Sequence, residues 1–377
     1  MKRSTDRILT THTGSLPRPP ALIDTLRSLD SGGAVDQAAF QRQTREAVEE
    51  VVKLQHDAGI DVINDGEEGK VGYSTYIKDR CTGFEGENRS TMVQAEGKDF
   101  PEWAEARARP SFTRPACNGP IAWRDFDAVK RDIENLRAAS QNSGAAEVFM
   151  SSASPGVIAI FLSNNYYPSH EAYLEAIANV MRDEYKAIVD AGFILQLDCP
   201  DLAMSRHNRF ADLSLADFRK MVELHVEVLN GAIKGIPADR MRTHLCWGNY
   251  EGPHQLDVEL KDIIDLILKA NTEGISFEGA NPRHENEWRV FRDVKLPDDK
   301  VLIPGVIDST TNFIEHPEVV ADRIERYAGV VGKERVIAST DCGFGTFAAG
   351  GAVFPRIAWA KLHALSQGAA LATKELR

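Results

Sequence analysis

Short runs of β-branched and apolar residues alternate with longer stretches of helical periodicity along almost the whole chain. This alternation limits the fold more than any other feature of the sequence, because it favours parallel strands joined by right-handed helical crossovers. The strand-like runs are 8–13, 61–67, 147–153, 193–198, 242–246, 275–278, 301–308 and 336–340. The expected helices are 40–58, 126–140, 169–190, 215–231, 258–270, 317–331 and 355–370. About eight β/α units result, the number that closes a (β/α)₈ TIM barrel.

The regular pattern is interrupted once, between residues 68 and 120. This stretch is charged, rich in glycine and aromatic residues, and too long for an ordinary connection. We interpret 1–377 as a single barrel domain with a long insertion after the second strand, at 68–120, which is either a peripheral hairpin or a lid over a substrate. A doubly wound open sheet is the alternative, but it would require a glycine-rich phosphate loop after an early strand, and no G-x-G-x-x-G follows one.

Composition excludes several classes of function. The net charge of −12 argues against a nucleic-acid partner. Apolar runs of about 18 residues are absent, so no transmembrane span is expected, and the amino terminus lacks the apolar core of a signal peptide. A cytoplasmic protein is therefore expected, acting on small molecules, and a homo-oligomer is compatible with the sequence. The five cysteines are odd in number and widely scattered, which suits free thiols and metal ligands better than disulfides.

Polar residues collect where the expected strands end. In a (β/α)₈ barrel the catalytic groups lie at the carboxyl ends of the strands. Those ends carry His12, Glu67, Ser152, Asp198, His244, Cys246, Glu278, Asp308 and Cys342. So many polar side chains at one rim are hard to explain as packing, so we expect the active site there.

A metal site is indicated by the fifth run, 242–246. Alternation along a strand places His244 and Cys246 on one face, so an imidazole and a thiol can converge on one ion. Zinc prefers nitrogen and sulfur ligands, and Glu278 and Cys342 are the candidates to complete its shell. Taken alone the pair is weak evidence, since a buried histidine, a core cysteine and a Glu278 that caps a helix would look the same.

Six motifs together resemble the catalytic barrel of cobalamin-independent methionine synthase. They are Thr10–Arg18, Asp65-Gly66-Glu67, Leu197-Asp198-Cys199-Pro200, His244-Leu245-Cys246, Phe277-Glu278 and Thr340-Asp341-Cys342-Gly343, in the family's order. The resemblance implies zinc bound by His244, Cys246, Glu278 and Cys342, and it implies that Glu67 and Asp198 hold the amino group of homocysteine.

Three features depart from that family. Full-length methionine synthases of this class have two fused barrels, whereas this chain has room for one. Cys199 stands where the family typically has glutamate, and the 68–120 insertion is unlike the family barrel. Single-barrel relatives include short methionine synthases and the epoxyalkane:coenzyme M transferases. The resemblance therefore indicates the type of reaction but leaves the substrate open.

The chemistry expected from these ligands is thiol activation. A free thiol with a pKa of about 8.5 is mostly protonated at neutral pH, and zinc coordination removes the proton. We expect His244, Cys246 and Cys342 to be permanent ligands and Glu278 to give way to the substrate thiol, which then attacks a methyl or another electrophilic carbon. Asp198 and Glu67 would position the substrate. Ser152, Arg18 and His12 are further candidates for substrate contacts, although His12 and Ser152 suit a supporting role equally.

Four functions remain open at this point. The first is a zinc-dependent methyltransferase acting on homocysteine or a similar amino thiol. The second is an alkyltransferase that joins a sulfonated thiol to an epoxide, for which Arg18, Arg206, His207 or Arg283 would hold the anionic tail. A zinc hydrolase is less favoured, because two thiolate ligands weaken zinc as a Lewis acid. The fourth is a non-enzymatic barrel with a structural zinc.

Overall fold

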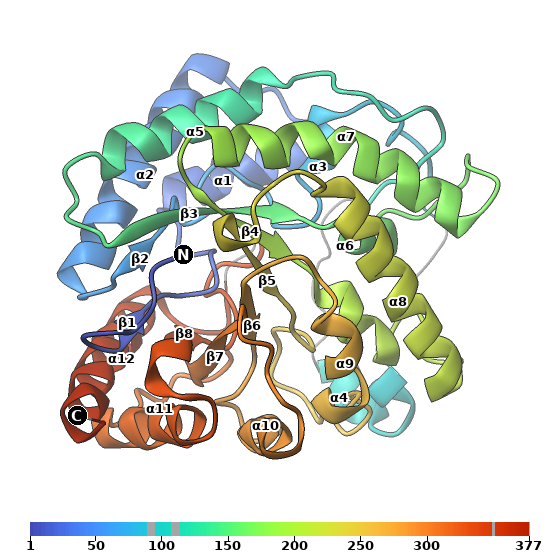
Figure 1. Cartoon of the computed structure of the whole chain (residues 1–377). Helices are drawn as coiled ribbons and strands as arrows, with labels where there is room; N and C mark the ends of the chain where they lie inside the picture. Colours follow the sequence, from blue (N-terminus) through green and yellow to red (C-terminus); the bar gives the residue numbers. More distant parts are fainter. Residues whose placement is uncertain (89–94, 107–113, 349–350, 377) are drawn as a thin grey trace.

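Eight parallel strands form the centre of the computed structural model, which describes residues 1–88, 95–106, 114–348 and 351–376 (Figure 1). The strands are β1 (Leu9–Thr10), β2 (Val62–Ile63), β3 (Glu147–Ala153), β4 (Ile194–Asp198), β5 (Met241–His244), β6 (Gly274–Phe277), β7 (Val301–Ile307) and β8 (Ile337–Thr340). Their order is β1-β8-β7-β6-β5-β4-β3-β2, and each strand is parallel to its neighbours.

Hydrogen bonds between the segments of β1 and β2 bring the two ends of this sheet together. The amide of Asp61 donates to the carbonyl of Thr10 at 3.2 Å, and the Thr11 hydroxyl donates to the carbonyl of Val62 at 3.0 Å. The predicted (β/α)₈ TIM barrel is therefore confirmed.

Helices surround the barrel (Figure 1). They are α1 (Pro20–Asp30), α2 (Gln37–Asp57), α3 (Ile77–Arg80), α4 (Pro101–Ala106), α5 (Asp127–Ser140), α6 (Pro155–Phe161), α7 (His170–Asp190), α8 (Leu215–Ala232), α9 (Ile264–Ile267), α10 (Val290–Asp293), α11 (Pro317–Val331) and α12 (Pro355–Glu375). The long helices bury one stripe each; in α7 it includes Tyr173, Ile177, Met181, Tyr185 and Ile188, three or four residues apart, as helical packing on a sheet requires. Among the described residues, none of the helices is long and apolar enough to cross a membrane.

The structure departs from the expected elements in three ways. The helix expected at 258–270 is a short 3₁₀ turn (Leu260–Asp262) followed by α9, because Ile263 has a φ of −131° that interrupts the helix. The first two strands are only Leu9–Thr10 and Val62–Ile63 instead of 8–13 and 61–67. Helices α1, α3, α4, α6 and α10 were not expected.

The barrel interior contains a buried arginine. Arg242 of β5 donates to Gln196 Oε1 (2.8 Å), Thr11 Oγ1 (2.9 Å) and the His12 carbonyl (3.0 Å), and its guanidinium lies 3.5 Å from the Phe149 ring centroid. These contacts satisfy its donors inside the barrel, and burial lowers the pKa of Arg242 to about 9. This layer forms the floor beneath the carboxyl rim.

The described parts of the 68–120 insertion lie against that rim. Gly72 forms an antiparallel bridge with Phe347, and the Ala348 amide donates to the Val71 carbonyl at 3.0 Å, which attaches the insertion to the segment after β8. Residues 89–94 and 107–113 of the insertion are outside the described residues.

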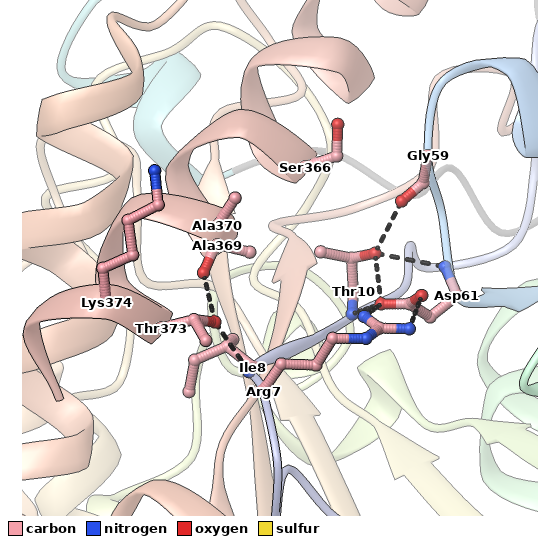
Figure 2. Close-up of a pocket in the computed structure, with 10 residues that line it drawn as sticks. All are labelled: Arg7, Ile8, Thr10, Gly59, Asp61, Ser366, Ala369, Ala370, Thr373 and Lys374. Carbon is pink, nitrogen blue, oxygen red and sulfur yellow. Dashed lines mark hydrogen bonds and ion pairs between the residues drawn. The ribbon is translucent and has the colours of Figure 1, made fainter. Parts of the chain in front are cut away.

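A pocket of about 220 Å³ lies at the opposite end of the barrel, between the start of β1 and helix α12 (Figure 2). Three of its polar residues pair with one another: Arg7 donates to both carboxylate oxygens of Asp61 (2.6 and 2.5 Å), and Asp61 also accepts from the Thr10 amide at 2.9 Å. Because the amino-terminal face of such barrels serves stability, we interpret this pocket as structural.

Candidate active site

One imidazole and two thiols meet at the carboxyl rim. His244 is the last residue of β5, Cys246 follows two residues later, and Cys342 lies two residues beyond β8. One ligand atom from each of these residues lies within 4.8 Å of the others, and all three side chains are buried. Two strands, β6 and β7, separate β5 from β8 in the sheet, so only the closed barrel brings these residues together.

His244 presents one ring nitrogen without a partner. Its Nδ1 lies 3.1 Å from Ser276 Oγ, whereas Nε2 is buried and makes no hydrogen bond. Burial lowers the pKa of His244 to about 3, so the ring is neutral. When Nδ1 carries the proton, Nε2 has a free lone pair and can bind a metal ion. Asp308, another polar residue at a strand end, accepts from the side chains of Thr310 (2.8 Å) and Thr311 (2.6 Å).

The two thiols contact each other in a buried environment. The hydrogen bond from Cys342, and then burial, raise the pKa of the Cys246 thiol well above its usual range. Two adjacent buried thiols of this kind ionise only when a cation compensates their charge. Nitrogen and sulfur donors around an unpartnered Nε2 fit the ligand preference of zinc.

Glu278 lies beside this group rather than in it. It follows β6 directly, and its carboxylate accepts from the Trp247 amide and from Asn281 Nδ2, both at 2.7 Å. Asp341 holds the same turn by accepting from the amides of Gly279 and Ala280 at 2.8 Å. The carboxylate is thus held near the thiols by protein groups, and burial raises the pKa of Glu278.

Two buried carboxylates form a second part of the rim. Asp198 ends β4, and Glu67 follows β2. Burial raises the pKa of both; for Asp198 the next largest cause is the negative charge of Glu67. Lys70 and Arg18 act in the opposite direction on Glu67, but Glu67 Oε2 is buried without a hydrogen-bond partner. One additional positive charge beside the two carboxylates would therefore stabilise their ionised forms.

Tyr73 of the insertion connects the two parts. Burial raises its pKa well above the usual range, and the next causes are the charges of Cys246, Cys342 and Asp198. Its ring packs on Phe161 and Phe347, with centroids 5.9 and 5.8 Å away. Tyr73 therefore lies near both the thiols and the acids, and the three rings form an aromatic wall beside them. Sequence reasoning recognised Tyr73 only as an aromatic of the insertion, since no spacing relates it to the strand ends.

Three further candidates are engaged with the protein itself. Ser152 donates to Glu184 of α7 at 2.7 Å, while its neighbour Ser151 lies beside Gln196 (3.4 Å) and hydrogen bonds to Glu67. His12 lies 2.7 Å from Gln55 through Nε2 and accepts the Gly14 amide at Nδ1, at 3.2 Å. Burial lowers the pKa of His12 to about 3. The structure does not bring the side chains of Ser152 and His12 to the acids.

The arginine candidates have equally local partners. Arg18 donates to the carbonyls of Gly345 (2.5 Å) and Glu67 (2.7 Å), which joins two rim loops. Arg206 donates to the carbonyls of Phe210 and Ala211, and Arg283 is exposed. Arg114, which sequence reasoning missed, lies near the wall: its guanidinium is 4.9 Å from the Phe161 ring centroid, and burial lowers its pKa while Tyr73 acts in the opposite direction.

A sequence profile described as "cobalamin-independent synthase, catalytic domain" matches residues 8–103 and 156–358, most of the chain. The chain belongs to this family. Family members similar to it include methionine synthases from Sulfolobus acidocaldarius, 26% identical over 372 residues (98% of this chain and 93% of the relative), and from Thermococcus kodakarensis, 25% identical over 367 residues (96% and 93%).

Solved structures agree with the family at the level of the fold. A B12-independent methionine synthase from Shewanella sp. W3-18-1, in complex with selenomethionine, superposes with a TM-score of 0.74 at 22% identity, covering 98% of this chain and 99% of that one. A putative vitamin-B12 independent methionine synthase from Listeria monocytogenes gives 0.64 at 18% identity, with the same coverage.

Proposed function

We propose that this protein is a zinc-dependent methyltransferase that methylates the sulfur of homocysteine or a closely similar amino thiol. The observation that carries the proposal is the meeting of His244, Cys246 and Cys342 at the carboxyl rim, with His244 Nε2 buried and unpartnered. The family and the names of its methionine synthase members support the reaction type.

The residues that would hold zinc are these three, with Glu278 as a fourth that can be displaced. When bound, zinc supplies the positive charge that keeps a substrate thiol in its nucleophilic thiolate form. Glu278 suits exchange because the Trp247 amide and Asn281 already hold its carboxylate, so it has partners when the substrate takes its place.

Glu67 and Asp198 would bind the substrate ammonium. An ammonium offers three donors, and Glu67 Oε2 is a buried acceptor without a partner. Each carboxylate raises the cost of charging the other, so a cation between them stabilises both. Tyr73, Phe161 and Phe347 would exclude water from the reacting sulfur, and Arg114, near Phe161, would meet the substrate carboxylate.

The alkyltransferase with a sulfonated thiol is the second candidate, and Arg114 is the observation in its favour. A guanidinium suits a sulfonate and a carboxylate equally. The acidic pair separates the two proposals, because an ammonium needs Glu67 and Asp198 whereas a sulfonated thiol without an amine gains nothing from them. We therefore favour the amino thiol.

Zinc-edge X-ray absorption of the zinc-loaded protein tests the choice. Homocysteine should add one sulfur scatterer at the metal and coenzyme M should add none. The reverse result would select the second candidate, and no sulfur gained with either thiol would contradict both. The Cys342→Ser variant is the control, since it should begin with one sulfur fewer.

A further inference from the structure

A second group of three buried ligand residues lies apart from the thiols. Glu96 belongs to a 3₁₀ turn of the insertion (Ala95–Lys98), His207 ends the 3₁₀ turn Met204–His207 after β4, and Asp257 lies in the connection after β5. One ligand atom from each lies within 4.8 Å of the others. The insertion and two barrel loops thus contribute one residue each.

The ligand atoms of this group lie close to one another. His207 Nδ1 and Asp257 Oδ1 are 2.9 Å apart and form an ion pair when the imidazole is protonated. Glu96 Oε2 is also buried without a partner, and the Glu96 side chain is fully buried. An unpartnered buried carboxylate oxygen beside an imidazole nitrogen and a second carboxylate oxygen is a set of atoms that can close around a single ion.

Glu96 is the carboxylate of this group whose charge is least compensated. Within the described chain, the Glu96 carboxylate is hydrogen bonded only to the neutral Tyr250 hydroxyl, at 3.1 Å. Asp257 is better compensated, because its Oδ2 is bonded to His254 Nδ1 (2.8 Å) and His284 Nε2 (3.0 Å), and its Oδ1 lies 2.9 Å from His207 Nδ1. A buried carboxylate such as Glu96 is costly without a cationic partner, so a cation here would be stabilising.

We propose that Glu96, His207 and Asp257 bind a second divalent metal ion, which fastens the insertion to the barrel. One imidazole and two carboxylates suit a first-row transition ion such as Mn²⁺ or Zn²⁺ better than Mg²⁺ or Ca²⁺, which take oxygen ligands. Flanking contacts join the same two parts: Trp103 packs on Tyr250 with ring centroids 6.0 Å apart, and Gln255 donates to Asp99 at 3.2 Å. The ion would hold in place the insertion that carries Tyr73.

Metal content measured on variants tests this site separately from the thiol site. The chain with Cys246→Ser and Cys342→Ser, exposed to Mn²⁺ or Zn²⁺ and then desalted, should retain one ion per chain. Adding Glu96→Gln should reduce retention to background, whereas adding Glu102→Gln, an exposed carboxylate of the same insertion, should leave it unchanged. Retention that survives Glu96→Gln, or no retention in the cysteine variant, would overturn the proposal.

A second measurement covers the case in which the cysteine variant does not fold. In the otherwise unchanged chain, two ions per chain should fall to one with Glu96→Gln and with His207→Asn. Hydrogen exchange of residues 95–106 should become faster in both variants and stay unchanged with Glu102→Gln. Equal metal content and equal exchange in all chains would contradict the second site while leaving the thiol site untouched.

Discussion

Glu67 illustrates how single residues of this site are held in place. Its φ of 58° lies in the left-handed region, which a residue with a side chain seldom adopts. The turn is held by side chains: Asn64 Oδ1 accepts the Gly66 amide at 2.8 Å and Asp65 Oδ1 accepts the Glu67 amide at 3.0 Å. Backbone strain of this kind is retained where the fold must aim a functional group.

The Glu67→Gln substitution should weaken binding of amine-bearing thiols without loss of zinc. It removes the charge that would face the substrate ammonium, and a hydrogen bond to a charged group contributes about 1.5–3 kcal/mol. We therefore expect the KM for homocysteine to rise by about ten- to a hundred-fold. Steady-state kinetics and zinc content measured together check this, and a parallel loss of zinc would contradict the assigned role.

The Gly14→Ala substitution should displace the Glu67 carboxylate by steric contact. A Cβ at this position would lie 2.5 Å from Glu67 Oε1 and 2.6 Å from Ser151 Oγ, and the φ of 141° already disfavours a side chain. We expect homocysteine binding to weaken and stability to fall by about 1–3 kcal/mol.

Calorimetry and urea unfolding measure both effects, with Gly144→Ala as the matched control. Gly144 also has a positive φ, 72°, but a Cβ there would meet nothing within 4 Å, so this variant isolates the backbone cost. If the two variants bind homocysteine equally well, the close contact between residue 14 and the Glu67 carboxylate does not contribute to substrate binding.

At the residue scale, the sequence predicted what depends on strand ends and missed what depends on loop backbone. The proximity of His244, Cys246 and Cys342 follows from strand alternation and barrel closure. The Trp247 amide that holds Glu278 carries no side-chain signal, so no pattern could reveal it. Ser152 shows how sensitive this reasoning is to register, because the adjacent Ser151 faces the acids.

At the scale of elements, periodicity located the long helices well and the short ones poorly. Helix α11 has the bounds expected for it, Pro317–Val331, because its apolar stripe repeats without interruption. Residues 258–270 are also periodic, yet they form α9 and a 3₁₀ turn, since the conformation of Ile263 depends on tertiary packing. Local patterns do not encode that contribution.

Helix α7 depends on its first residue for part of its stability. Ser169 is the N-cap, and its hydroxyl accepts the Ala172 amide at 3.1 Å. Ser169→Ala should lower the free energy of unfolding by about 1 kcal/mol, because that amide loses its partner. Urea unfolding measures the change, and Ser366→Ala, whose hydroxyl donates only to its own helix, should cost much less. Equal losses would show that the cap contributes nothing of its own.

At the scale of the whole molecule, the two ends of the barrel differ in how their polar groups are satisfied. The amino-terminal pocket pairs Arg7 with Asp61 and leaves little to bind (Figure 2). The carboxyl rim instead buries His244 Nε2, Glu67 Oε2 and Glu96 Oε2 without partners. Function is therefore expected at the rim, where folding has left binding groups uncompensated.

The rim also couples folding to pH through His284. This ring stacks on Trp247 at 4.1 Å, donates to Asp257 and lies 3.3 Å from Glu287. Burial alone would lower the pKa of His284, but the hydrogen bonds to Asp257 and Glu287 outweigh burial and raise it to about 10. An unfolded histidine titrates near pH ~6.5.

Because the folded pKa is the higher one, this histidine stabilises the fold fully below about pH 6.5, and the contribution disappears as pH rises through about 10. His284→Asn should therefore destabilise the protein by on the order of 2–4 kcal/mol at pH 6 and by much less at pH 10. Urea unfolding of both proteins across this range measures the difference, and the exposed His363→Asn should show none. A difference that stays constant or grows with pH would mean that His284 is neutral in the folded protein, and the charge balance around Asp257 would then require another cation.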